Sequence, residues 1–342
     1  MDRKIIFKNG IWILLVAAGL VGGYFMASSY IPGNTAVNEV KSDGAGNPAL
    51  PENFKYDMAK LKQYDPRQLL YGEETKIKTG LKEPFGLTVN KKDGRVLVVS
   101  TEGMLVCDGA IAGKVAALPV RLEGPGSVSF GFAGELLLAG RDSVNIVSGT
   151  IIGFGKKGKG VGEFKYITSV KANAKYIFTA DAGNRRVCKF DLKGKYLGQI
   201  GRKDKAAGKN FVIPSPHMDM DFDSKGNLWV ANAGLLQLEK YSPEGVFVSS
   251  WGKHGINIDE FIGCCNPVNF VIDGGDNFIT AEKGVLRIKK YDKTGKFLGV
   301  VAPPGTFNEK NTSIPLAVDS KNRVYALDTI EKTVRVFSEK GY

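Results

Sequence analysis

Side chains that commonly perform catalysis or bind metals are scarce in this sequence of 342 residues. It has 2 histidines and 4 cysteines. The Cys-x-x-Cys-His haem motif, the HExxH zinc motif, the serine nucleophile elbow and a complete phosphate-binding loop are all absent. The stretch "GFGKKGKG", residues 153–160, has the glycines and lysines of a phosphate loop but lacks its Gly-Lys-Ser/Thr ending. We therefore expect a basic surface loop there, and none of these four classes of active site.

Acidic residues are also in the minority. The chain has 35 Asp and Glu against 47 Lys and Arg, a formal net charge of +12. Residues 151–210 alone hold 15 Lys and Arg and 4 Asp and Glu, an excess of 11. Such a patch attracts anionic partners. No pattern of base-stacking aromatic residues accompanies the charge, so we expect no nucleic-acid partner.

What the sequence does contain predicts an all-β protein. It has 43 glycines and 12 tyrosines, 43% of its residues are hydrophobic, and long helical periodicity is missing outside the N-terminus. This composition is typical of many short strands joined by tight turns.

The first 31 residues have the pattern of an uncleaved signal anchor. Arg3, Lys4 and Lys8 precede the uncharged run 11–31, which is long enough to span a bilayer as a helix. No positive charge follows until Lys41, which predicts a cytoplasmic N-terminus and a membrane-anchored chain whose bulk is extracytoplasmic, in the periplasm or on the cell surface. A cleaved signal peptide is the alternative. Residues 32–65, rich in Gly, Pro, Asn and Ser, are expected to form a flexible linker.

Repeats in the second half of the chain predict a propeller. "DSKGNLWVAN" (223–232), "DGGDNFITAE" (273–282) and "DSKNRVYALD" (319–328) align without gaps, and further strand-turn-strand units follow them. A period of about 45 to 50 residues made of four short strands is the signature of a propeller blade. At "TADAGNRRVCKFDLKGKYLG" the chain resembles the NHL repeat family, which implies a six-bladed β-propeller over residues 66–342. The last blade lacks a fourth strand, so we expect a strand within residues 68–80 to complete it.

Propeller topology brings two sets of loops to one face, namely those that enter each innermost strand and those between the second and third strands. "PSPHMD" (214–219) and "GCCNPVN" (263–269) belong to the first set of loops. The loops of the second set begin with the polar residues that end the second strands. We expect these groups to meet around one mouth of the central channel. The predicted ligand-binding residues are Arg186, His217, Asp219, Asn232, Cys264, Cys265, Asn266, Glu282, Lys283 and Arg287.

The adjacent cysteines Cys264 and Cys265 have three interpretations. Cysteines in exported proteins are usually bridged, and a bridge between neighbours forms a strained eight-membered ring of the kind found at functional sites. Two free thiols are the second interpretation. Metal ligation is the third, in which His217, Met218 and Met220 would complete a copper site. Cys107 and Cys188 fall in strands of different blades and are expected to be small buried residues.

The resemblance implies a binding or scaffold module, for which we expect a protein or a small polar or anionic ligand. The predicted N-terminal helix makes the membrane a second partner. A propeller enzyme is the alternative. A calcium-dependent hydrolase similar to lactonases would use Glu282, Asn232, Asn269 and Asp219 as an oxygen cage, whereas the peptide-amidating lyase of similar fold needs three histidines and is excluded. No cofactor is assigned, with calcium or copper in the channel as the alternatives. A thiol redox accessory role also stays open.

Overall fold

The computed structural model describes residues 57–201 and 211–341. The predicted anchor, residues 1–31, and the linker up to residue 56 lie outside the described residues. Among those that are described, the helices are too short and too polar to cross a membrane. The end of the expected linker contains the short helix α2 (Met58–Leu61), whose Leu61 is buried with Ile262 and Val285. Residues 57–61 therefore pack against the folded domain.

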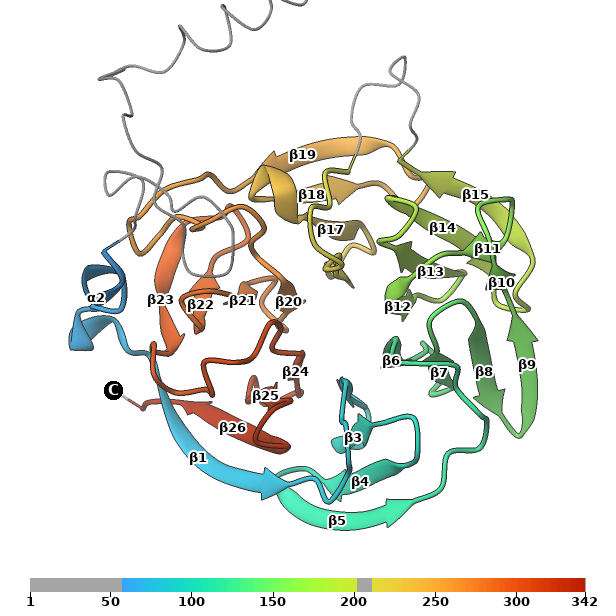
Figure 1. Ribbon diagram of the computed structural model, residues 1–342, viewed down its shortest axis with the longest axis horizontal. Helices are drawn as coiled ribbons and strands as arrows, with labels where there is room; N and C mark the ends of the chain where they lie inside the picture. Colours follow the sequence, from blue (N-terminus) through green and yellow to red (C-terminus); the bar gives the residue numbers. More distant parts are fainter. Residues whose placement is uncertain (1–56, 202–210, 342) are drawn as a thin grey trace, which may run out of the picture. The chain divides into compact units, whose positions relative to one another are not determined.

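Six antiparallel four-stranded sheets form a ring of blades around a central axis (Figure 1). Blades one and two contain β2 (Gly86–Val89), β3 (Arg95–Val99), β4 (Met104–Asp108) and β5 (Ile111–Ala116), then β6 (Ser127–Phe130), β7 (Leu136–Ala139), β8 (Val144–Ser148) and β9 (Thr150–Phe154). Blades three and four contain β12 (Ile167–Ala172), β13 (Tyr176–Asp181), β14 (Arg186–Asp191) and β15 (Tyr196–Ile200), then β16 (Met220–Phe222), β17 (Leu228–Asn232), β18 (Gln237–Tyr241) and β19 (Phe247–Trp251). Blade five contains β20 (Asn269–Ile272), β21 (Phe278–Glu282), β22 (Arg287–Tyr291) and β23 (Phe297–Ala302). The predicted all-β six-bladed propeller is confirmed.

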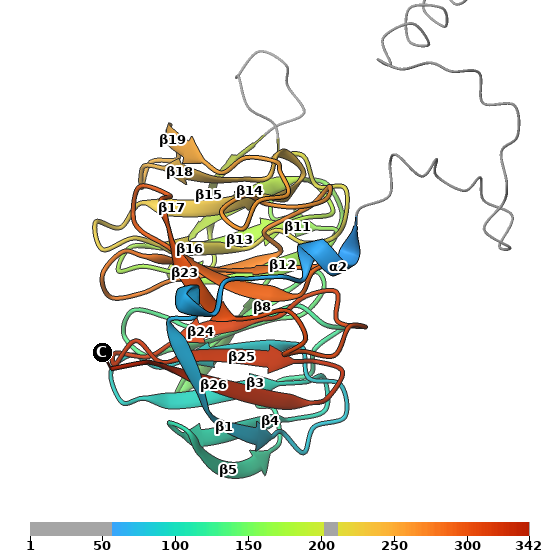
Figure 2. The same ribbon diagram turned by 90° about the vertical axis from the view of Figure 1, so that its left-hand side faces the viewer.

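Blade six is assembled from both ends of the domain. Its strands β24 (Leu316–Val318), β25 (Val324–Asp328) and β26 (Thr333–Glu339) come from the C-terminus, and its outer strand is β1 (Tyr71–Lys78). Figure 2 shows β1 running beside β26. In this antiparallel pair Tyr71 lies opposite Glu339 and Lys78 opposite Thr333. The strand expected within residues 68–80 is thus β1. It covers the edge that β26 would otherwise expose.

The hydrophobic core is divided among the contacts between neighbouring blades. The described residues form six large clusters, and each joins residues of two adjacent sheets. Cys188 is fully buried between blades two and three, and Cys107 is buried between blades six and one. Both cysteines behave as the small core residues that were expected.

Short polar turns repeat on the face opposite the loops that enter the innermost strands. In the turn after β16, the Asp223 carboxylate accepts hydrogen bonds from the backbone N–H groups of Lys225 and Asn227, at 3.1 and 2.9 Å. Asp273 and Asp319 do the same in blades five and six. The Asp that opens each aligned repeat is therefore explained by turn formation.

The remaining elements of the described residues are short. They are the 3-10 helices η2 (Pro66–Gln68) and η4 (Ala233–Leu235) and the parallel strand pair β10 (Lys156–Lys157) and β11 (Glu163–Phe164).

Candidate functional site

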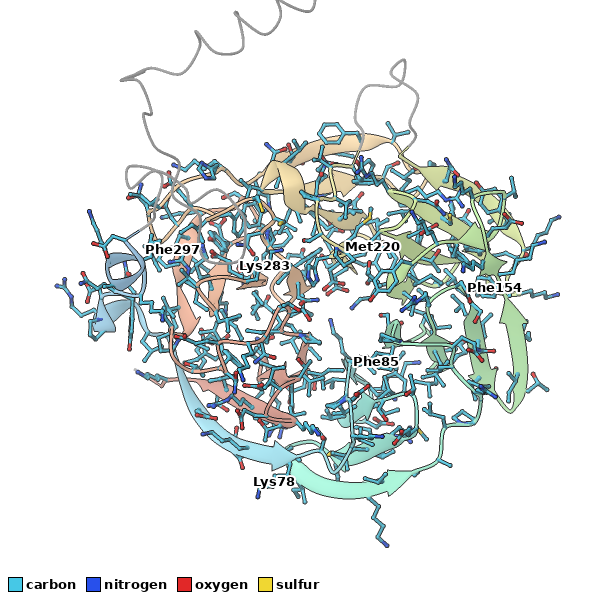
Figure 3. The ribbon with its side chains drawn as sticks, in the orientation of Figure 1. Lys78, Phe85, Phe154, Met220, Lys283 and Phe297 are labelled. Atoms are coloured by element: carbon cyan, nitrogen blue, oxygen red, sulfur yellow. The ribbon has the colours of Figure 1, made fainter. Side chains whose placement is uncertain are left out.

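A cavity of about 930 Å³ opens at the centre of the ring, on the face formed by the loops that enter the innermost strands. All six blades contribute to its wall. In Figure 3, Phe85, Met220 and Lys283 lie toward the ring centre, whereas Lys78, Phe154 and Phe297 lie toward its periphery. The charged lining residues are Lys82, Glu83, Lys283 and Lys332, and the hydroxyl-bearing ones are Thr101, Tyr166, Thr168, Ser215, Thr312, Ser313 and Thr329.

Positive charge and hydroxyl groups dominate this wall. The wall contains three lysines and one glutamate, so its ionised residues carry a formal charge of +2. Lys283 Nζ donates a hydrogen bond to Ser215 Oγ at 3.0 Å, which ties a cation of blade five to the loop that enters blade four. Lys82 lies 3.7 Å from Glu102, but both side chains are mostly exposed, so that pair is weak. The arrangement can neutralise and hydrogen-bond an anion.

His217 lines the cavity as the sequence predicted, and its surroundings keep it uncharged. Burial, and to a lesser extent the positive charge of Lys283, lowers the pKa of His217 to about 4. At neutral pH the imidazole is therefore a neutral donor and acceptor in the cavity wall.

Cys264 and Cys265 lie next to the cavity wall as two free thiols. Cys264 is exposed and Cys265 is 2% exposed, and their Sγ atoms are 3.0 Å apart. Burial alone would raise the pKa of the Cys265 thiol, but Cys264, together with Ser215 and Lys283 of the cavity wall, lowers it. The structure thus brings the cysteine pair together with Lys283, as predicted. The disulfide itself stays a prediction.

Asn266 holds this loop in place. Its Nδ2 donates to the carbonyl oxygens of Ile262 and Lys283, at 2.7 and 3.2 Å, and its Oδ1 accepts from the Lys283 N–H at 2.9 Å. The side chain is 2% exposed. Asn266 therefore fixes the backbone beside the cysteines and the cavity lysine, and has little polar capacity left for a ligand.

Four further predicted ligand-binding residues are also buried and do not line the cavity, namely Arg186, Asn232, Glu282 and Arg287. Glu282 is fully buried, 3.2 Å from Arg287 Nη2 and 2.5 Å from Lys289 Nζ. Asn232 Oδ1 accepts from the Val212 N–H at 2.8 Å. These groups brace loops within the protein, and Arg186 does the same for the loop before blade three, where its Nη2 donates to the carbonyl oxygens of Gly160 and Glu163 at 2.9 and 2.6 Å. The expectation that they gather at the mouth is wrong.

The expected oxygen cage for calcium is not assembled. Asp219 and Asn269 do meet deeper in the channel, at a cavity of about 50 Å³, where Asn269 Nδ2 donates to Asp219 Oδ2 at 3.2 Å. Lys171 lines that same small cavity and lies 3.5 Å from Asp221. The other two proposed ligands, Glu282 and Asn232, are buried elsewhere. A cation would meet the ammonium group of Lys171 there.

The copper alternative also lacks its ligand set. Met218 and Met220 are 1% and 0% exposed and belong to the hydrophobic cluster between blades three and four. Throughout residues 57–201 and 211–341, no group of three or more His, Cys, Asp or Glu side chains could hold a metal ion. The residues present do not fit either metal.

Sequence reasoning missed several residues of the site. Lys82 lies in the loop that enters blade one, outside the aligned repeats, and Lys332 lies between the second and third strands of blade six. Lys289 looks like an ordinary strand lysine although it is fully buried. Ser215 lies within the loop "PSPHMD", from which the sequence predicted only His217 and Asp219 as ligand-binding residues. Lys82, Ser215 and Lys332 all lie in the two sets of loops that propeller topology brings to one face, and this position could have identified them as lining residues.

Comparisons with known proteins identify the fold alone. No family model and no curated protein sequence matches the chain. A streptogramin B lyase structure is 12% identical with a TM-score of 0.53, covering 79% of this chain and 98% of that one. Two virginiamycin B lyases from Staphylococcus aureus are also similar. One, selenomethionine-substituted, is 12% identical with a TM-score of 0.47 and covers 78% of this chain and 88% of its own. The other, a catalytically inactive variant with quinupristin, is 11% identical with a TM-score of 0.49 and covers 78% and 99%. At such identities only the six-bladed propeller is shared.

Proposed function

We propose that this chain is a membrane-tethered, extracytoplasmic propeller that binds a small anionic ligand in its central cavity. The observation that carries this proposal is the composition of the cavity wall, which contains three lysines and a set of hydroxyl groups but a single glutamate. The proposed ligand bears carboxylate or phosphate groups.

The cavity has the size and chemistry for such a ligand. Small-molecule sites are usually about 300 to 1,000 Å³ in volume, and the cavity of about 930 Å³ falls within that range. Lysine ammonium groups and hydroxyls donate hydrogen bonds to anionic oxygens, and charged pairs of this kind are stronger than neutral ones. Phe85 and Tyr166 add aromatic surface for the carbon skeleton of the ligand.

Direct binding to the full-length protein in detergent tests this function. The probes are citrate and inorganic phosphate, measured by calorimetry at low and moderate salt. The test variant replaces Lys82, Lys283 and Lys332 with Met. Its matched control replaces Lys193, Lys225 and Lys293, three exposed lysines in turns on the opposite face, so that the net charge changes equally.

We expect the cavity variant to weaken binding of at least one probe by about 100-fold and the control by less than about threefold, since each lost charged hydrogen bond contributes roughly 1.5 to 3 kcal/mol. Equal losses in both variants would show that net charge alone attracts the anions. No binding of either probe to the wild-type protein would overturn the proposal.

The proposed location rests on the N-terminal sequence. The uncharged run 11–31 after three positive charges supports an anchor with the propeller outside the cytoplasm. The repeat "TADAGNRRVCKFDLKGKYLG" supports assigning the blades to the NHL type. Alkaline carbonate extraction of cell membranes, combined with protease digestion from the extracytoplasmic side, tests the anchor. A protein released by carbonate, or protected from the protease, would contradict it.

A further inference from the structure

The cysteine pair differs chemically from the two other cysteines of the chain. Cys107 and Cys188 are buried in hydrophobic clusters between blades, and burial raises the pKa of both thiols, that of Cys188 to about 12. Cys264 is exposed, and its Sγ lies 3.0 Å from that of Cys265. External reagents can therefore reach one sulfur of the pair, with the second directly behind it.

Lys283 and Ser215 give the inner sulfur a polar environment. Lys283 Nζ donates a hydrogen bond to Ser215 Oγ at 3.0 Å. Burial alone would raise the pKa of the Cys265 thiol, but Cys264, Ser215 and Lys283 together lower it. The backbone on both sides is fixed, because Asn266 bonds the Lys283 peptide to the cysteine loop. A cation and a hydroxyl group thus favour the ionised form of one sulfur of an adjacent pair. Such surroundings stabilise a thiolate.

We propose that Cys264 and Cys265 form a thiol–disulfide exchange site that transfers two electrons to a small organic disulfide. This inference goes beyond ligand binding and does not depend on it, although Lys283 belongs to both sites.

The reaction proceeds in two displacements. Cys264 loses its proton to water, its Sγ attacks one sulfur of the disulfide R–S–S–R, and the leaving thiolate takes a proton from water. Cys265 then loses its proton to water, attacks Cys264 Sγ and displaces the second thiolate, which is also protonated. Two protein thiols and one disulfide become one Cys264–Cys265 bond and two small thiols. The small disulfide is reduced and the cysteine pair is oxidised.

The acidities of the two thiols support this order. Burial alone would raise the pKa of Cys265, but hydrogen bonds from Cys264, Ser215 and Lys283, together with the positive charge of Lys283, lower it below the ordinary value. The hydrogen bond to Cys265, followed by partial burial, raises the pKa of Cys264. Once Cys264 carries the mixed disulfide, Cys265 is therefore suited to act as the resolving thiolate.

Mass spectrometry of the reduced full-length protein, mixed with bis(2-hydroxyethyl) disulfide, tests the proposal. The wild-type protein should lose two hydrogens from the peptide that contains Cys264 and Cys265 and retain no adduct, with Cys107 and Cys188 still reduced. Cys265→Ser should accumulate a stable mixed disulfide on Cys264. Cys264→Ser should react at least tenfold more slowly than the wild type. Circular dichroism of each variant establishes that it is folded.

Lys283→Met provides a finer test. It should slow closure of the pair by about threefold to tenfold at pH 7, because less Cys265 is then ionised. Lys225→Met, an exposed lysine on the opposite face, is the matched control and should leave the rate unchanged. A wild-type protein that keeps a stable adduct on Cys264, or that does not react, would overturn the proposal. Loss of citrate and phosphate binding would not, because that test concerns the cavity lysines.

Discussion

Glu282 and Lys283 are neighbours in the chain and have opposite structural roles. Glu282 is fully buried against Arg287 and Lys289, and burial lowers the pKa of that lysine to about 8. Lys283 extends into the cavity wall. In blade six, the buried Asp328 accepts hydrogen bonds from Asn308 and Asn311 while the next residue, Thr329, lines the cavity.

In these two blades, buried residues that bind other parts of the protein alternate with residues that line the cavity. The last residue of the second strand binds the loop that enters its own blade or the beginning of the third strand, and the residue after it lines the cavity. Polar character alone does not distinguish the two. What differs is whether neighbouring donors or acceptors already satisfy the side chain.

The largest expected effect compares the two neighbours directly. Glu282→Gln removes the buried charge that balances Arg287 and Lys289, so the free energy of unfolding should fall by about 3 to 5 kcal/mol. Lys283→Met should change it by less than about 1 kcal/mol. Urea denaturation measures both. Equal stability of the two variants would break the distinction, and if Glu282→Gln does not fold while Lys283→Met does, the distinction holds.

A second neighbouring pair sharpens the comparison in blade three. Arg186 donates to two backbone carbonyl oxygens, whereas Arg185 is exposed. Arg186→Met should lower the free energy of unfolding by about 2 kcal/mol, because those acceptors lose a charged donor. Arg185→Met should stay within about 0.5 kcal/mol of the wild type. A larger loss for Arg185→Met in thermal denaturation would contradict the assignment.

His217 gives the smallest effect, and the effect depends on pH. Its pKa is about 4 in the folded protein and near 6.5 in the unfolded chain, so the unfolded chain binds more protons between these values. Stability should therefore fall as the pH drops through this window, by about 1 to 2 kcal/mol between pH 7 and 4.5. His217→Gln should lose this contribution to the pH dependence. Identical unfolding curves for both proteins across that pH range would show that His217 is not shielded.

The repeat pattern predicted the fold well because a period of four strands determines which strands pair and where the loops meet. It placed His217, Cys264, Cys265 and Lys283 together for that reason. The repeat pattern could not show that Glu282 and Arg287 are buried. Their cluster is completed by Lys289, which donates to the carbonyl oxygen of Glu260, and these two residues are 29 positions apart in the sequence. Lys82 was missed because its loop lies outside the clear repeats, and Lys332 because it lies just beyond the aligned segment 319–328.

Covalent labelling of lysines, read by mass spectrometry with and without saturating citrate, tests most directly whether the central cavity is the ligand site. We expect citrate to protect Lys82, Lys283 and Lys332 from the label while Lys193, Lys225 and Lys293 react as before. Unchanged labelling of the three cavity lysines, or protection confined to the opposite turns, would contradict it.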